Sequence, residues 1–533
     1  MCHDTSRFRF AALEVTEFVV RLEVMEFVVR LEVMEFVVRR EVTEFVVRLE
    51  VMEFVVRLEV TEFVVRLEVT EFVVRLEVTE FVISSERSES RNLRVSTSII
   101  ILIIHETGSS YSAAFIKTTE KFMDFFSFKK GQAYCERIPL KILAKKVDTP
   151  VYVYSSAAIS QQCKQFTEAF SSYPTTFCYA VKANSNLSIL RQIFSAGFGA
   201  DIVSQGELER AVLAGVEVKK VVYSGVGKKE GEIKRALELG ILAFNVESFF
   251  ELELISKTAS QMKKKAAICL RLNPDIDAKT HPKIATGLHS TKFGIETKQL
   301  ESFLSFIEKN ASLELIGLAC HIGSQLTDME PIAEAARKMM QLVSYVKNKG
   351  FALRYLNMGG GLGIRYVDER IPQIKEYAKV LLNEIKGLEL ILEPGRILVG
   401  NAGVLLIRVE GIKESSVKKF AIVDAGMNDL LRPTLYGAVH EIDSVEESVS
   451  SKKETYDVVG PVCETGDYLG LDVLLPKLKQ DDLLFVRSCG AYGFSMASRY
   501  NSRPGAAEVL VDGETFRVVR KRESFKDLWA LEE

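Results

Sequence analysis

The sequence predicts an α/β protein in which a (β/α)8 barrel is followed by a mostly antiparallel β domain. From about residue 150 to about residue 405, short β-branched runs alternate with helical patterns. This alternation is typical of parallel strands joined by crossover helices. After about residue 405, strand-like runs follow one another with few helical patterns between them, which favours antiparallel pairing.

Eight strand candidates lie in the alternating region. They are FCYAVKAN (177–184), FGADIVS (198–204), KVVYSG (220–225), AFNVES (243–248), AICLRLN (267–273), LIGLACHIGS (315–324), LRYLNMGGG (353–361) and LELILEPGR (388–396). Helical patterns such as GELERAVLAG (206–215) and EGEIKRALELG (230–240) separate them. Eight such units in about 220 residues fit a (β/α)8 barrel.

Each of these apolar runs stops at polar or glycine residues. In chain order, these residues are Lys182, Asp201, Ser224, Glu247, Arg271 with Asn273, His321, Gly359 to Gly361, and Glu393 with Arg396. Active sites of such barrels lie at the C-terminal ends of the strands. We therefore expect these residues to share one mouth of the barrel.

The C-terminal region contains five further strand candidates. They are VLLIRVEGI (404–412), KFAIVDAG (419–426), YDVVGP (456–461), DLLFVRSCGAY (482–492) and AAEVLVDG (506–513). The strand-like segment FSFKKGQAYCERIPL (126–140) precedes the barrel and is expected to join the same domain. The predicted domains are thus residues 151–405 for the barrel, and 406–533 together with 118–150 for the β domain.

Residues 1–117 form an N-terminal extension of a different character. Residues 13–84 are eight copies of a nine-residue unit, LEVTEFVVR with minor variants. Nine residues turn a helix by about two and a half turns, and an odd period moves each strand side chain to the opposite face in the next copy. Neither structure gains a persistent apolar face, so we expect a low-complexity, disordered extension.

Composition and charge exclude several classes of protein. The chain has 533 residues, 47% of them hydrophobic, and a net charge of −3, which argues against a strongly basic nucleic-acid binder. The apolar run 99–104 is far shorter than the ~20 residues that span a bilayer. The eight cysteines contain no CxxC pair. We expect a cytoplasmic protein with reduced thiols, no membrane or nucleic-acid partner and no metal site.

Four of the strand ends suggest one cofactor. A lysine in a low-dielectric site, such as Lys182, is expected to have a lowered pKa and can form an imine with an aldehyde. The glycine-rich GGGLG (359–363) lets backbone N–H groups approach a phosphate. EPGR (393–396) offers a carboxylate for a pyridine nitrogen and an arginine for an anion, and His321 could stack on an aromatic ring. Each feature alone also suits a turn, an ion pair or a core histidine, but together they indicate pyridoxal 5'-phosphate.

Roughly residues 120–530 resemble the diaminopimelate decarboxylases, which are pyridoxal-phosphate decarboxylases of the alanine-racemase-like (fold type III) class. The motifs that carry the resemblance are YAVKANSN (179–186), SQGELERA (204–211), FNVES (244–248), RLNPDIDAKTHPKIATG (271–287), KFGI (292–295), HIGSQ (321–325), NMGGGLG (357–363), EPGR (393–396), DAGMNDLLRPTLYGAVH (424–440), GPVCETGDYLG (460–470) and GAYGFSMASRYNSRP (490–504).

The resemblance implies a role for each matching residue. Lys182 would bond to the cofactor aldehyde, His321 would stack on the ring with Ser324 close by, and Glu393 would bond the ring nitrogen. The phosphate cradle would consist of Gly359, Gly360, Gly361, Pro394, Gly395 and Arg396, completed by Tyr492. Arg396, Arg432, Tyr436, Glu464 and Tyr492 would hold the far end of the substrate. Cys463 would return a proton to the substrate carbon, and it would come from the partner subunit of a homodimer with shared active sites.

The substrate implied is meso-2,6-diaminopimelate, which would yield L-lysine and CO2 in the last step of lysine biosynthesis. Arg432 suits the distal carboxylate of this substrate, and Glu464 suits its distal ammonium group. An ornithine, arginine or carboxynorspermidine decarboxylase on the same scaffold is the first alternative, and it would not need Arg432 in this role. A non-catalytic regulatory relative is the second, and it would be expected to lose Lys182 or the glycine loop.

Overall fold

The structure is a computed structural model that describes residues 125–276, 292–446 and 453–532, together with the backbone of strands between residues 19 and 116. The chain divides into two compact units, Met1–Asp124 and Phe125–Glu533. In the first unit, seven strands form one sheet. They are β1 (Val19–Val20), β2 (Glu26–Leu31), β3 (Val37–Leu49), β4 (Val55–Leu67), β5 (Glu71–Ile83), β6 (Ser98–Thr107) and β7 (Ser110–Ile116).

The repeats set the register of this first sheet. Strands β3, β4 and β5 are parallel, and each residue pairs with its equivalent two repeats further on, Val37 with Val55 and Val55 with Val73. The register is therefore shifted by 18 residues from each of these strands to the next. The expectation that the extension is disordered stays a prediction, and residues 1–18 and the segments between these strands lie outside the described residues.

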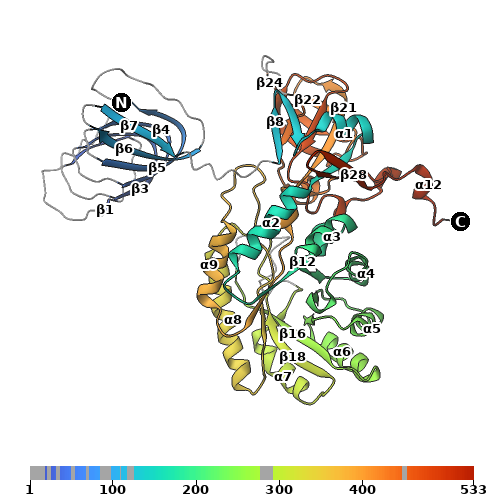
Figure 1. The fold of residues 1–533 in the computed structure, drawn as a ribbon. Coiled ribbons are helices and arrows are strands. Elements are labelled where there is room, and N and C mark those ends of the chain that lie inside the picture. The colour runs from blue at the N-terminus through green and yellow to red at the C-terminus, as the bar shows by residue number, and fades with distance from the viewer. Residues whose placement is uncertain are drawn as a thin grey trace. The chain divides into compact units, whose positions relative to one another are not determined.

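The second unit contains the predicted barrel (Figure 1). Eight parallel strands close on themselves through the pairing of β15 with β16. They are β12 (Thr175–Ala180), β13 (Gly199–Ile202), β14 (Val221–Tyr223), β15 (Ala243–Val246), β16 (Ala266–Asn273), β18 (Leu313–Ala319), β19 (Tyr355–Asn357) and β20 (Glu389–Leu392). Each lies within or overlaps one of the eight predicted runs, so the predicted barrel is confirmed. The short strand β17 (Ile295–Glu296) pairs with β16 outside the closed ring.

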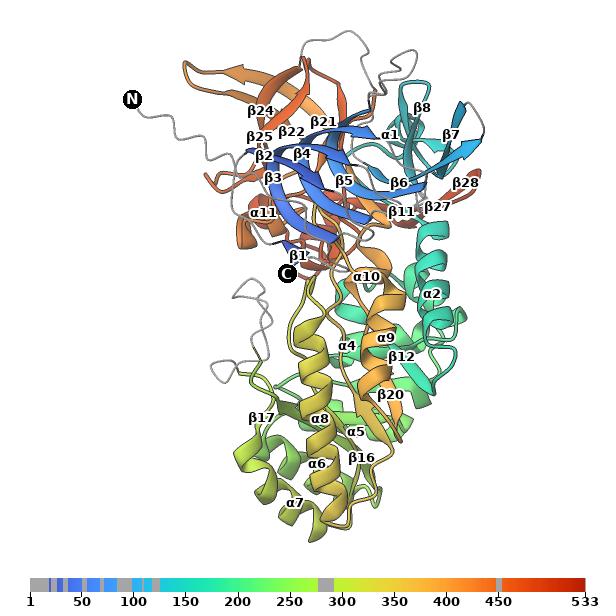
Figure 2. The same ribbon diagram turned by 90° about the vertical axis from the view of Figure 1, so that its left-hand side faces the viewer.

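Helices surround the barrel on its outer side (Figures 1 and 2). Seven follow a barrel strand: α3 (Leu187–Ser195), α4 (Gln205–Leu213), α5 (Glu230–Leu239), α6 (Phe249–Gln261), α7 (Leu300–Glu308), α8 (Glu330–Asn348) and α9 (Ile374–Glu384). The last strand is followed only by the single turn α10 (Arg396–Val399), so α2 (Ser156–Ala169) packs between α9 and α3 instead. One continuous apolar core fills the space between strands and helices.

The β domain is built around a nine-stranded, mostly antiparallel sheet. Its strands are β11 (Val151–Ser155), β21 (Gly403–Glu414), β22 (Lys419–Val423), β23 (Ile442–Ser444), β24 (Lys453–Val459), β25 (Tyr468–Pro476), β26 (Leu483–Val486), β27 (Ala507–Asp512) and β28 (Thr515–Arg520). All five predicted C-terminal runs overlap strands of this sheet. Strand β11 falls inside the range 151–405 predicted for the barrel, yet it pairs with β21 and β27.

The segment before the barrel forms a separate small sheet packed on the β domain. Strands β8 (Phe126–Lys129), β9 (Gln132–Cys135) and β10 (Ile138–Pro139) pair antiparallel and lead into α1 (Leu140–Val147). Phe126 and Cys135 share an apolar core with Val404 and Phe485 of the larger sheet.

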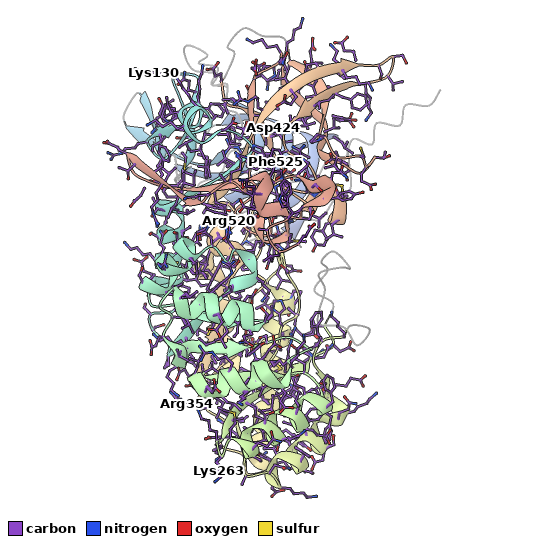
Figure 3. All side chains as sticks on the ribbon, turned by 90° about the vertical axis from the view of Figure 1, so that its right-hand side faces the viewer. Lys130, Lys263, Arg354, Asp424, Arg520 and Phe525 are labelled. Atoms are coloured by element: carbon purple, nitrogen blue, oxygen red, sulfur yellow. The ribbon has the colours of Figure 1, made fainter. Side chains whose placement is uncertain are left out.

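The barrel presents the C-terminal ends of its strands to the β domain. Lys263 and Arg354, which precede strands β16 and β19, lie at the end of the barrel far from the β domain residues Asp424 and Arg520 (Figure 3). The opposite mouth therefore faces the β domain. Among the described residues, no helix is both long and apolar enough to cross a membrane.

Candidate active site

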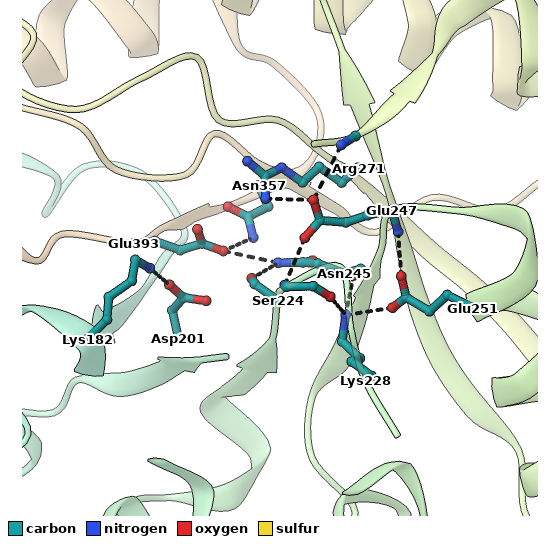
Figure 4. Close-up of polar contacts among 12 residues, drawn as sticks. Lys182, Asp201, Ser224, Lys228, Asn245, Glu247, Glu251, Arg271, Asn357 and Glu393 are labelled. Carbon is teal, nitrogen blue, oxygen red and sulfur yellow. Dashed lines mark hydrogen bonds and ion pairs between the residues drawn. The ribbon is translucent and has the colours of Figure 1, made fainter. Parts of the chain in front are cut away.

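Lys182 lies just beyond the first barrel strand, in the short turn η1 (Val181–Ala183). Its Nζ is 2.6 Å from Oδ2 of Asp201, at the end of the neighbouring strand β13 (Figure 4). The Asp201 side chain is fully buried, whereas that of Lys182 is 40% exposed. The other carboxylate oxygen of Asp201 is buried and has no hydrogen-bond partner in the structure. The lysine thus reaches from a buried anion towards the open mouth of the barrel.

The predicted lowering of the Lys182 pKa is wrong. Burial alone would lower this pKa, but the carboxylates of Asp201 and Glu393 raise it well above the ordinary value for lysine. Lys182 is therefore held as an ammonium ion before any aldehyde reaches it.

Glu393 follows the last barrel strand and is held by two amides. Asn357 Nδ2 donates to Glu393 Oε1 at 2.6 Å, and Asn245 Nδ2 donates to the same oxygen at 3.1 Å (Figure 4). Asn245 also donates to Ser224 Oγ. Burial and the nearby charge of Asp201 raise the pKa of Glu393 to about 7. The carboxyl group is thus fixed in direction and can gain or lose a proton near neutral pH.

The glycine loop packs against His321 and has no room for side chains. The backbone N–H of Gly360 donates to His321 Nδ1 at 3.3 Å. A Cβ at Gly359 would lie 2.7 Å from this nitrogen, and one at Gly360 would lie 2.1 Å from the carbonyl oxygen of Glu393. Gly361 has a φ of +110°, which side chains rarely allow. These three positions require glycine.

His321 is neutral in this setting. Burial and the charges of Arg271 and Lys182 lower its pKa to about 3. Arg271 itself is paired with Glu247, with Nη1 2.9 Å from Oε2. A neutral imidazole ring with Nδ1 as an acceptor is consistent with the hydrogen bond from the glycine loop.

Arg396 begins α10 and is buried among neutral partners. Its Nη2 donates to Ser324 Oγ at 2.9 Å, and its Nη1 donates to the hydroxyl of Tyr366 at 2.5 Å. The guanidinium carbon lies 4.7 Å from the centre of the Tyr492 ring. The Nε atom is buried and has no hydrogen-bond partner in the structure.

The segments around Pro394 and Tyr492 join Arg396 to the lysine turn. The backbone N–H of Ala180 donates to the carbonyl of Pro394, and a Cβ at Gly395 would lie 2.9 Å from that of Ala180. The backbone N–H of Tyr492 donates to the carbonyl of Ala183. The β domain residue Tyr492 thereby sits directly beside the lysine turn of the barrel.

Arg432 extends the cluster into the β domain. It is the first residue of α11 (Arg432–Tyr436), and its guanidinium lies 4.3 Å from the centre of the Tyr366 ring. Its Nη1 is 2.6 Å from Nε2 of His440. Tyr436 is the last residue of the same helix.

Cys463 and Glu464 are placed differently, in an exposed turn between β24 and β25. The backbone N–H of Cys463 donates to Asn501 Oδ1, and Tyr500 donates to Glu464 Oε1. None of the contacts described for either residue is to a barrel residue of the same chain. These two residues are the part of the predicted site that the single chain does not bring together with Lys182.

The turn that carries Cys463 is anchored by one buried carboxylate. Asp467 Oδ2 accepts the N–H of Val462, and Oδ1 accepts the N–H of Met427, both at 2.6 Å. The carboxylate leaves no room for a side chain at Gly460 or Gly426, because a Cβ on either residue would lie within 3 Å of it. Thr434 of α11 also donates to the carbonyl of Gly466, so the turn is tied to the helix of Arg432.

Sequence reasoning did not single out four residues of the site: Asn245, Asn357, Tyr366 and His440. The asparagines lie within the quoted motifs FNVES and NMGGGLG, and His440 ends the motif that contains Arg432. Tyr366 lies outside all quoted motifs and follows no strand. The place of Tyr366 in the site is seen only from its contacts with Arg396 and Arg432 in the folded chain.

Comparisons with known proteins identify the relatives of this chain. Residues 156–400 match the family model described as "Pyridoxal-dependent decarboxylase, pyridoxal binding domain". A diaminopimelate decarboxylase from Vibrio cholerae is 49% identical over 77% of this chain and 99% of its own length, and one from Aquifex aeolicus is 44% identical over 76% and 97%.

The chain belongs to the diaminopimelate decarboxylase family. A crystal structure of a diaminopimelate decarboxylase from Helicobacter pylori, complexed with L-lysine, matches with a TM-score of 0.72 and 44% identity. It covers 74% of this chain and 99% of that one. The family and these neighbours establish the barrel with its appended sheet domain as the fold of a pyridoxal-dependent decarboxylase.

Proposed function

We propose that the protein decarboxylates meso-2,6-diaminopimelate to L-lysine and CO2 with pyridoxal 5'-phosphate as its cofactor. When bound, pyridoxal phosphate supplies an electron sink for the electron pair that remains when CO2 leaves. The residues fit this group. Lys182 offers the amine, Glu393 a directed carboxyl group for the pyridine nitrogen, and the cradle of Gly359 to Gly361 a surface of backbone without side chains.

The buried, unpartnered Nε of Arg396 is a further sign of an anion binding site. A buried polar atom without a partner is costly, and a phosphate or carboxylate oxygen is the natural acceptor for a guanidinium N–H. Ser324 and Tyr492 hold Arg396 from its other sides. We infer that Arg396, Pro394 and Gly395 lie beside the phosphate, with His321 against the ring.

The choice of substrate rests on two buried arginines that have no acidic partner among their described contacts. Arg396 and Arg432 are each only 7% exposed, and every contact that the structure describes for their guanidinium groups is to a neutral group. Two buried cations without an acidic partner favour a ligand that brings carboxylates of its own. Diaminopimelate keeps one carboxylate after the other has left as CO2, and we infer that Arg432, with Tyr436, holds the one that stays.

The exposed turn between β24 and β25 contains the two remaining residues of the predicted site, Cys463 and Glu464. We infer that Cys463 delivers a proton to the carbon that lost CO2 and that Glu464 holds the distal ammonium group. Both side chains are exposed in a turn anchored by Asp467, and none of the contacts described for them is to the barrel of the same chain, which supports a homodimer in which each subunit completes the site of the other.

The test is a decarboxylation assay with the purified full chain and added pyridoxal phosphate. We expect CO2 and L-lysine from meso-diaminopimelate, little turnover of ornithine or arginine, and no activity or cofactor absorption band in Lys182→Ala. Arg432→Ala is expected to keep the band while the KM for diaminopimelate rises. Turnover of another diamino acid but not of diaminopimelate would contradict the substrate, and an intact band in Lys182→Ala would contradict the cofactor attachment.

A further inference from the structure

Arg432 is held differently from the arginines of the second unit that form ion pairs. Arg271, Arg235 and Arg487 are each paired with a carboxylate, those of Glu247, Glu209 and Asp443. Arg432 instead contacts the ring nitrogen of His440 and the face of Tyr366. Its positive charge is therefore held in place without being neutralised by the protein.

The hydrogen bonds of His440 define which of its nitrogens carries the proton. Nδ1 lies 2.7 Å from the carbonyl oxygen of Arg487, which can only accept, so Nδ1 carries the hydrogen. Nε2 lies 2.6 Å from Nη1 of Arg432, which can only donate, so Nε2 is the acceptor. Burial and the charge of Arg432 lower the pKa of His440 to about 3, in agreement with this neutral form.

Tyr366 completes the support by linking the two arginines. Its hydroxyl accepts from Arg396, and its ring packs edge-on against His440 at 5.0 Å between ring centres. The line of contacts Arg396, Tyr366, Arg432 and His440 leads from the cofactor end of the site into the β domain. A change at His440 therefore acts on the far end of the line, away from Lys182.

We propose that His440 is a positioning residue that fixes the Arg432 guanidinium through a neutral acceptor and so sets the preference for a substrate with a distal carboxylate. This inference rests on the proposed function. An acidic residue in its place would pair with Arg432 and compete with the carboxylate of the substrate, and an apolar one would leave the guanidinium without its hydrogen bond. Only a neutral acceptor gives both a fixed geometry and an available charge.

The test compares His440→Leu, His440→Gln and His440→Glu in the cofactor-loaded full chain. In the Leu and Glu variants, the KM for diaminopimelate is expected to rise about ten- to a hundredfold with a smaller change in kcat, as for loss of a charged hydrogen bond. Gln, which can place an oxygen near the position of Nε2, is expected to recover part of the loss. The absorption band of the cofactor and the melting temperature identify any variant that fails to fold.

Two competitive inhibitors separate a positioning role from a purely structural one. L-lysine carries the α-carboxylate that Arg432 would bind, whereas 1,5-diaminopentane has the same chain without it. Inhibition by lysine is expected to weaken in parallel with KM, and inhibition by 1,5-diaminopentane to change less than about twofold. Equal losses for both inhibitors, or an unchanged lysine affinity in His440→Leu, would overturn the proposal.

Cys489→Ala is the matched control. Its Sγ lies 3.9 Å from Nδ1 of His440, so it changes the packing beside the ring but leaves the Nε2 contact in place. We expect its KM and its lysine inhibition to match the wild type. If the wild-type chain itself does not turn over diaminopimelate, the proposed function fails, which is a different outcome from wild-type activity that His440 does not influence.

Discussion

The ammonium group of Lys182 lies 2.6 Å from Oδ2 of Asp201, a fully buried carboxylate on the neighbouring barrel strand. Burial lowers the lysine pKa, but this ion pair and the charge of Glu393 together keep the pKa high. The neutral amine that reacts with an aldehyde is therefore scarce in the cofactor-free protein.

The first prediction concerns this pair. Asp201→Asn removes the largest of the charge effects that raise the lysine pKa, so the pKa falls. In the cofactor-free protein, the rate of covalent attachment of pyridoxal phosphate, followed by absorption, is expected to rise at pH 8 and to reach its plateau at lower pH. The exposed Asp472→Asn is the control. An unchanged pH profile in Asp201→Asn would show that this carboxylate does not govern the amine.

Glu393 should make the stability of the cofactor-free protein depend on pH. Its pKa is raised to about 7, so the folded chain binds more protons than the unfolded chain between about pH 4.5 and pH 7. Stability is therefore expected to fall as pH rises through this window. Glu393→Gln keeps an acceptor for Asn357 and Asn245 and should remove this fall, giving a free energy of unfolding roughly 1–3 kcal/mol higher at pH 8. Urea unfolding at pH 5 and pH 8 measures the difference, and a variant no more stable than wild type at pH 8 would disprove it.

The glycine loop should not tolerate a methyl group. In Gly360→Ala the new Cβ would lie 2.1 Å from the carbonyl oxygen of Glu393, so the backbone of the cradle must shift. We expect the rate to fall about a hundredfold, as for a displacement of about 1 Å in a site, together with weaker cofactor retention. Gly231→Ala, in helix α5 with no atom within 4 Å of its Cβ, is the control and should be as active as wild type. Full activity in Gly360→Ala would mean that the loop is not a tight cradle.

A buried ion pair between the segment after β14 and helix α6 should matter for stability. Lys228 Nζ lies 2.6 Å from Glu251 Oε1, and both side chains are almost completely buried. Lys228→Met leaves the carboxylate unpaired and is expected to cost about 3–5 kcal/mol in the free energy of unfolding. Lys349→Met, which breaks the exposed pair with Glu301, should leave that free energy nearly unchanged. Equal effects of the two changes would contradict the argument.

Mixing two inactive variants tests the shared active sites. Lys182→Ala and Cys463→Ala are each expected to be inactive, but random re-association makes half of the dimers hybrid, with one intact site in each. About a quarter of wild-type activity should return after mixing and subunit exchange. No recovery, with exchange demonstrated by mass, would place Cys463 and Lys182 of the same chain in one site.

The sequence predicts the eight barrel strands because each is an apolar run that stops abruptly at polar residues or glycine. Strands β25 and β28 are not predicted, because most of their side chains are partly or fully exposed. Their sequences therefore lack the alternation of apolar and polar residues that marks a half-buried strand. The lysine pKa is predicted wrongly because Asp201 lies 2.6 Å away only after folding. Tyr366 and His440 are missed for the same reason, since their roles arise from contacts with Arg396 and Arg432 and not from any local pattern.

Tyr492, Arg396, Tyr366, Arg432 and His440 form one connected cluster of contacts that includes residues of both the barrel and the β domain. Each member is oriented by its neighbours, so substitutions within the cluster will show strong epistasis. Redesign towards a diamine-forming decarboxylase would then need several simultaneous exchanges, and evolution along this route would pass through poorly active intermediates.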